Sequence, residues 1–263
     1  MKLGISSSCF FPLETEKAVK LLVENKIPNI EIFINAPSEI TPRFLDILKE
    51  ILKNGETEVV AVHPHSSALE PYNVFTKYER RFYDAVEDYK RYAEFSRKLG
   101  AKIIPFHGDL KKRNILSDEE YIEKFGILKA AAAEEGAILA QENVNLFRSS
   151  ELGFLQKMKD AIPDVAFVCD IKQIKRAGTD IFETIEVMGE NLKHFHISDS
   201  TPQSDCLLPF DGETDFDTVF EKLAQTGYNG AVMIEVYKDA YKNTGEVLDS
   251  CRLLEKTLKR RKK

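Results

Sequence analysis

The sequence predicts an α/β fold, a (β/α)8 TIM barrel, and three observations support it. The 263 residues are 43% hydrophobic and 30% charged, which suits one domain of about 250 residues, the usual size of such barrels. Short apolar runs alternate along the chain with segments whose apolar residues recur at helical spacing. The apolar runs are continuous rather than half polar, as expected for parallel strands that are covered on both faces.

We expect each strand to be followed by a helix. The expected strands are residues 2–9, 27–34, 59–65, 102–107, 138–144, 165–171, 192–198 and 230–237. The expected helices are residues 14–26, 41–52, 77–99, 117–136, 150–162, 180–188, 215–226 and 244–259. Thr41 before Pro42, and Ser117 three residues before Glu120, are signals of a helix start.

One domain is expected over residues 1–263, with no linker inside it. A doubly wound open sheet is the alternative arrangement of such a chain. That fold is less favoured, because residues 6–9 (SSSC) stand where its glycine-rich phosphate turn would follow the first strand.

The charge and cysteine content make several functional classes less favoured. The net charge of −6 argues against a nucleic-acid partner, since no overall positive field attracts phosphates. The one basic cluster, residues 259–263 (KRRKK), is interpreted as favourable charge at a helix end. No apolar run approaches the roughly 20 residues needed to cross a membrane. Four widely spaced cysteines, without a CxxC pair or a signal peptide, predict a cytoplasmic protein.

Ionisable residues gather in the expected strands. The histidines are His63, His65, His107, His194 and His196, and none falls in an expected helix. Carboxylates end the fifth, sixth and eighth strands at Glu142, Asp170 and Glu235, and Glu31 lies within the second. Carboxylates and imidazoles that converge at one rim of a barrel would repel one another without a cation. A mixture of nitrogen and oxygen donors suits a divalent ion of intermediate hardness.

Several segments together resemble one superfamily. They are residues 141–143 (QEN), Asp170, residues 196–199 (HISD), residues 208–216 (LPFDGETDF), and residues 227–230 (GYNG) leading to Glu235. In order and spacing they resemble the xylose isomerase-like superfamily, which holds sugar phosphate isomerases and epimerases and the family 2 AP endonucleases. The resemblance spans nearly the whole chain.

The resemblance implies a metal site and a reaction. Its four metal ligands would be Glu142, Asp170, His196 and Glu235, around one divalent ion, Mn, Co, Mg or Zn. In the epimerase branch the two glutamates also serve as the acid and base on opposite faces of a substrate carbon. The implied function is a metal-dependent isomerase or epimerase of a small sugar, sugar phosphate or polyol, acting by proton abstraction beside a carbonyl.

The chain also departs from the pattern of the superfamily. Gln173 stands where a histidine usually follows the sixth-strand aspartate, and residues 204–210 lack the histidine that would complete a three-zinc repair centre. An endonuclease IV-like repair enzyme is therefore the second choice, although His65 and His107 match positions of its further zinc ligands. An inosose dehydratase-like lyase shares the enolate-forming first step, and an inert barrel is a further alternative.

The remaining expectations concern the substrate and the assembly. His65, His107 and Gln173 are expected to contact substrate oxygens. Arg148, Lys172 and Lys238 follow strand ends and either meet an anionic group of the substrate or are solvated surface charge. A homo-oligomer is compatible with the sequence. Glu142 and Glu235 are expected to titrate as a coupled pair.

Overall fold

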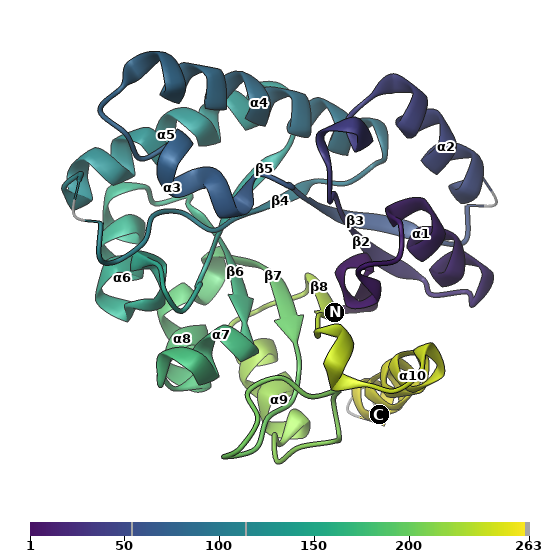
Figure 1. The fold of residues 1–263 in the computed structure, drawn as a ribbon. Coiled ribbons are helices and arrows are strands. Elements are labelled where there is room, and N and C mark those ends of the chain that lie inside the picture. The colour runs from purple at the N-terminus through teal and green to yellow at the C-terminus, as the bar shows by residue number, and fades with distance from the viewer. Residues whose placement is uncertain (54, 114, 261–263) are drawn as a thin grey trace.

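The computed structural model describes residues 1–53, 55–113 and 115–260, and within them eight parallel strands close into a barrel (Figure 1). The strands are β1 (Lys2–Ser6), β2 (Asn29–Phe33), β3 (Glu58–His63), β4 (Ile103–Phe106), β5 (Ile138–Glu142), β6 (Ala166–Asp170), β7 (Leu192–Ile197) and β8 (Ala231–Ile234). Neighbours in the chain are neighbours in the sheet, and β8 pairs with β1. The predicted (β/α)8 TIM barrel is confirmed.

Helices surround the strands in Figure 1. They are α1 (Thr15–Glu24), α2 (Pro42–Leu52), α3 (Glu70–Asn73), α4 (Glu79–Lys98), α5 (Asp118–Glu134), α6 (Leu152–Ala161), α7 (Ile171–Ala177), α8 (Ile181–Met188), α9 (Phe216–Gln225) and α10 (Thr244–Arg260). The Ser117 hydroxyl accepts from the backbone N–H of Glu120, whose carboxylate accepts in return from the N–H of Ser117. Thr41 caps α2. Both predicted helix starts are confirmed.

All eight strands end earlier than predicted, and short helices lie in the segments that follow most of them. The helix α7 begins directly after β6, with Asp170 as its N-cap. This helix turns the residues after Asp170 back over the barrel mouth, where the sequence predicted a loop. Residues 261–263 of the basic cluster lie outside the described residues. None of the described helices is both long enough and apolar enough to span a bilayer.

The barrel interior carries its own small apolar layer. Ala61, Ile103, Ala140, Ala166 and Val168 form a buried cluster separate from the large core between strands and helices. Because side chains alternate along a strand, Ala140 and Val168 share their face with Glu142 and Asp170. Small apolar residues thus fill the barrel below the polar residues at its mouth.

Candidate metal centre

Four side chains converge at the carboxyl ends of the last four strands. Glu142 ends β5, Asp170 ends β6, His196 lies in β7 and Glu235 follows β8. One ligand atom from each lies within 4.8 Å of the others. His196 Nδ1 is 3.8 Å from Glu142 Oε1, 3.7 Å from Asp170 Oδ2 and 3.3 Å from Glu235 Oε2. Parallel register explains the convergence, since Asp170 pairs with His196 across β6 and β7.

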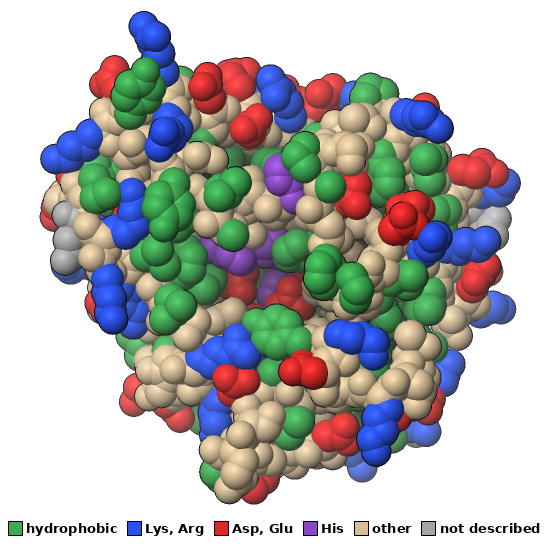
Figure 2. All heavy atoms as spheres, viewed as in Figure 1, with side chains coloured by type: hydrophobic (Ala, Val, Ile, Leu, Met, Phe, Trp, Pro, Cys, Tyr) green, Lys and Arg blue, Asp and Glu red, His purple; other side chains and the backbone are tan. Residues whose placement is uncertain are grey.

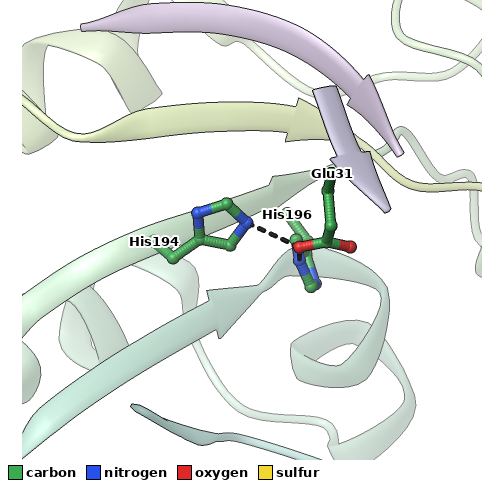
Figure 3. Close-up of side chains that lie close together, drawn as sticks. All are labelled: Glu31, His194 and His196. Carbon is green, nitrogen blue, oxygen red and sulfur yellow. Dashed lines mark hydrogen bonds and ion pairs between the residues drawn. The ribbon is translucent and has the colours of Figure 1, made fainter. Parts of the chain in front are cut away.

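Glu31 contacts both His194 and His196 (Figure 3). Its Oε2 lies 3.1 Å from His196 Nε2 and 2.8 Å from His194 Nε2, and its Oε1 accepts from the Ser6 hydroxyl at 2.9 Å. Burial raises the pKa of Glu31, but the two histidines outweigh it and hold the pKa well below its ordinary value. An ionised Glu31 accepts a hydrogen bond from the Nε2–H group of His196, and the other ring nitrogen, Nδ1, is therefore directed at the carboxylates.

These residues fit a divalent cation. Among the described residues, His196 Nδ1 and Glu142 Oε2 are buried without a hydrogen-bond partner. Burial lowers the pKa of His196, but Glu235 and Glu31 raise it well above its ordinary value, so the ring attracts a proton or another positive charge. One imidazole nitrogen and three carboxylates form a donor set suited to Mn, Co, Mg or Zn ions.

The two glutamates share one direction of pKa shift. Burial raises the pKa of Glu142, yet His107, His196 and His63 bring it well below its ordinary value. The pKa of Glu235 is likewise raised by burial and brought well below its ordinary value by His196 and Lys172. Both carboxylates are therefore ionised near neutral pH, and either can accept a proton.

Lys172 lies inside this group of residues. Its ammonium donates to Asp170 Oδ2 and, at 2.5 Å, to Glu235 Oε2. Burial lowers the pKa of Lys172, but the two carboxylates raise it well above its ordinary value. Lys172 was expected either to meet an anionic group of the substrate or to be solvated surface charge; it is buried, and two predicted metal ligands hold it.

A cavity of about 360 Å³ opens above these residues. Figure 2 shows histidine and carboxylate atoms at the base of a hollow in this face, with hydrophobic side chains around it. The cavity is lined by Ser8, Phe11, Phe33, Asn35, His63, His107, Glu142, Lys172, Gln173, Glu235, Val236 and Tyr237. Of the predicted substrate-binding residues, His107, Lys172 and Gln173 line it.

His63 lies at the site in place of His65. The Nε2 atoms of His63 and His107 lie 3.1 Å apart. Glu142 Oε2 lies 3.8 Å from the Nε2 atom of His63 and 3.4 Å from that of His107. The strand β3 ends at His63 because Pro64 cannot donate to the ladder, so the prediction that the strand continues to residue 65 is wrong. His65 instead meets the Tyr92 hydroxyl at 2.9 Å and does not line the cavity.

Arg148 and Lys238 also lie away from the cavity lining. The Arg148 guanidinium donates to Asp118 Oδ1 at 3.2 Å and to the Leu116 carbonyl at 2.5 Å. Arg148 does not line the cavity. Because it is buried, it is not the solvated surface charge that was the alternative either. The Lys238 ammonium lies 4.1 Å from the centre of the Tyr241 ring on the exposed side of its loop.

Asp199 builds the loop beside the site. Its Oδ1 accepts from the backbone N–H groups of Ser200 and Thr214, and its Oδ2 accepts from those of Phe210 and Gly212. A Cβ on Gly212 would lie 2.5 Å from Asp199 Oδ1, which requires glycine there. The aspartate of the HISD segment therefore orders the loop and is not one of the four candidate ligands.

Comparison with known proteins agrees with this architecture. A family model described as a xylose isomerase-like TIM barrel matches residues 19–257. The uncharacterised protein MJ1311 of Methanocaldococcus jannaschii is 23% identical over 255 residues, 89% of this chain and 83% of that protein.

Two solved structures share the fold. A D-tagatose 3-epimerase-like protein has a TM-score of 0.82 at 22% identity, covering 98% of this chain and 97% of its own. The IolI protein with a bound zinc atom has a TM-score of 0.77 at 21% identity, and the match covers 98% of this chain and 96% of that protein. Because the family model spans most of the closed barrel and all four strand ends that carry the candidate ligands, the chain belongs to the xylose isomerase-like TIM barrel family.

Proposed function

We propose that this protein is a divalent-metal-dependent isomerase or epimerase of a small sugar or polyol derivative. The observation that carries the proposal is a pair of glutamates, the buried Glu142 and the partly buried Glu235, which reach one cavity from β5 and from the end of β8. Both are ionised and both adjoin His196. The name of the D-tagatose 3-epimerase-like protein, whose fold is similar, supports the same class of reaction.

The chemistry is proton transfer at a carbon beside a carbonyl. Glu142, Asp170, His196 and Glu235 would hold the ion, which when bound supplies Lewis acidity to stabilise the enediolate charge. One glutamate removes the proton from the carbon, and the other carboxylate, which must first take up a proton from solvent, donates that proton to the opposite face. His63 and His107 offer ring nitrogens to substrate oxygens at the cavity wall.

We also propose that the substrate is uncharged where it enters the cavity. Histidines aside, Lys172 is the one cationic side chain among the described lining residues, and two carboxylates already bind it. A phosphate needs free arginine, lysine or backbone donors. Phe11, Phe33 and Tyr237 instead offer apolar surface to the C–H face of a sugar.

The class of partner, the compartment and the assembly of the protein are also proposals. A small-molecule partner, rather than a membrane or nucleic acid, fits a cavity of this size and chain charge. The buried, unpaired state of Cys9, Cys169, Cys206 and Cys251 supports a reducing cytoplasm. One domain over residues 1–263 and a homo-oligomeric assembly stay predictions.

Replacing each glutamate tests the proposed reaction. Metal-loaded protein is assayed on a panel of ketoses, their phosphates and inosose-like compounds, with solvent deuterium incorporation at the substrate carbon as a second readout. Glu142→Gln and Glu235→Gln, at saturating metal, are expected to lose about 10²- to 10⁴-fold in turnover, because an amide transfers no proton. Glu183→Gln, an exposed position on α8, is the matched control.

Each other outcome has a definite meaning. Near-normal rates and deuterium exchange in both variants would make the glutamates ligands only, with the base elsewhere. Loss of water from an inosose, without ketose epimerisation, would favour the lyase. Cleavage at abasic sites by zinc-loaded protein would favour the repair enzyme.

A further inference from the structure

Lys172 is the feature of the site that the proposed reaction leaves unexplained. Its side chain is buried, with 3% of its surface exposed. Its ammonium donates to Asp170 Oδ2 and Glu235 Oε2, one oxygen on each of two candidate ligand residues. His196 Nδ1 lies 3.7 and 3.3 Å from the same two oxygens. The lysine charge and the ligand nitrogen thus face one pair of carboxylate oxygens.

The local structure holds the lysine there. Lys172 is the second residue of α7, which Asp170 begins by accepting the backbone N–H of Gln173 at 3.2 Å. Arg176, one turn later, is occupied elsewhere, since it binds the Asp205 carboxylate at 2.7 and 3.0 Å and the Tyr237 hydroxyl at 2.8 Å. Of these two cations of α7, only Lys172 reaches the ligand carboxylates.

We propose that Lys172 is a tethered cation that lowers the affinity of the four-residue site for a divalent ion and thereby sets that affinity. This inference rests on the proposed metal site. Its ammonium takes lone pairs on Asp170 and Glu235 that a divalent ion would use, and its positive charge repels the ion at short range. Both effects are strong because the groups are buried and weakly screened by water. Lys172 acts on the ligands and is therefore a positioning residue.

A purely structural lysine predicts the opposite sign. If Lys172 only held the carboxylates in place, its removal would loosen Asp170 and Glu235 and weaken metal binding. If Lys172 competes with the ion, its removal leaves the negative charge of the three carboxylates available to the ion, and metal binding becomes tighter. The direction of the change in metal affinity separates the two roles without any assay of turnover.

The test measures dissociation constants for Mn²⁺ and Zn²⁺ by competition with a chromophoric chelator at fixed pH and ionic strength. Lys172→Met is expected to bind about 10- to 100-fold more tightly than the wild-type protein, the range typical of changes next to metal ligands. Lys172→Gln keeps hydrogen-bond donors without charge, so it should tighten binding too. Lys172→Arg keeps the charge and should stay near the wild-type value. Lys175→Met, exposed on the same helix, is the matched control.

The failures are distinguishable. Unchanged or weaker binding in the neutral variants would overturn the role of Lys172 while leaving the metal site in place. If Lys172→Met does not fold, Lys172→Gln and Lys172→Arg still separate charge from hydrogen bonding. If neither the wild-type protein nor Lys172→Met binds either ion, the proposed metal site itself is overturned.

Discussion

Glu31 is the residue on which the geometry of His196 depends. A single oxygen, Oε2, faces the Nε2 atoms of both His194 and His196, and the carboxylate is fully buried. Because Nε2 is occupied, the other ring nitrogen of His196 is directed at Glu142, Asp170 and Glu235. A carboxylate behind a ligating histidine fixes its tautomer and increases its basicity.

Glu31→Gln is expected to weaken divalent-ion binding about 10- to 100-fold, because an amide is a poorer partner for two imidazole N–H groups. Chelator competition measures the affinity, and ¹⁵N NMR of the imidazoles reports the tautomer of His196. Glu58→Gln is the control, since that exposed carboxylate binds Lys2 at the other end of the barrel. Wild-type affinity together with an altered tautomer would show that orientation of His196 is unimportant.

At the scale of an element, Glu70 holds the turn that carries His107 into the cavity. Its Oε2 accepts the backbone N–H groups of His107 and Gly108 at 2.8 and 2.6 Å, and its Oε1 meets the Tyr89 hydroxyl. Gly108 has a φ of 97°, so glycine suits this turn. Burial raises the pKa of Glu70 to about 8, although Tyr89 and the backbone N–H groups act to lower it.

This pKa predicts a pH dependence of stability. Between about 4.5, the ordinary value for a glutamate, and about 8, folded Glu70 keeps a proton that the unfolded chain has lost. Stability from this group is full below that window and falls as pH rises through it, by about 1.4 kcal/mol per pH unit. Glu70→Gln mimics the protonated acid and removes this slope.

Denaturant unfolding of both proteins from pH 5 to pH 8 provides the measurement, and the difference between them cancels all other titrating groups. Parallel curves for wild type and Glu70→Gln would show that Glu70 is ionised in the folded protein. Glu190→Gln, an exposed carboxylate after α8, should follow the wild-type curve.

On the scale of the whole molecule, a metal ion would connect β5, β6, β7 and the end of β8, and through Glu31 also β2. Binding to the folded chain alone stabilises it, by about 2.7 kcal/mol at a hundred times the dissociation constant. For a chain of this size that corresponds to roughly 5–10 °C in melting temperature. We expect metal-loaded protein to melt higher than chelator-treated protein by about this amount.

Elemental analysis of the same samples should give one divalent ion per chain. About three zinc ions would favour the repair enzyme, and His63 and His107, beside Glu142, are a group of candidate ligands for a further ion. Equal melting temperatures with no bound metal would favour the inert barrel.

Local patterns in the sequence determined the fold class and placed most of the candidate ligands at strand ends. The alternation of strands and helices, the capping residues Thr41 and Ser117, and the polar residues at strand ends all depend on neighbours a few positions apart. Because parallel strands place their carboxyl ends at one rim, those patterns predicted that carboxylates and histidines at the strand ends would converge, and the family resemblance singled out Glu142, Asp170, His196 and Glu235, which do lie together.

The tertiary structure alone decided which residues contact one another across the barrel. It selected His63 over His65, brought Glu31 behind two histidines, turned Arg148 toward Asp118, and set Lys172 against two carboxylates. These contacts depend on where a strand ends, how the barrel closes and how each loop folds back over its mouth. Apart from the contact of Lys172 with Asp170, these contacts join residues far apart in the chain, and a single sequence carries no local signal for them.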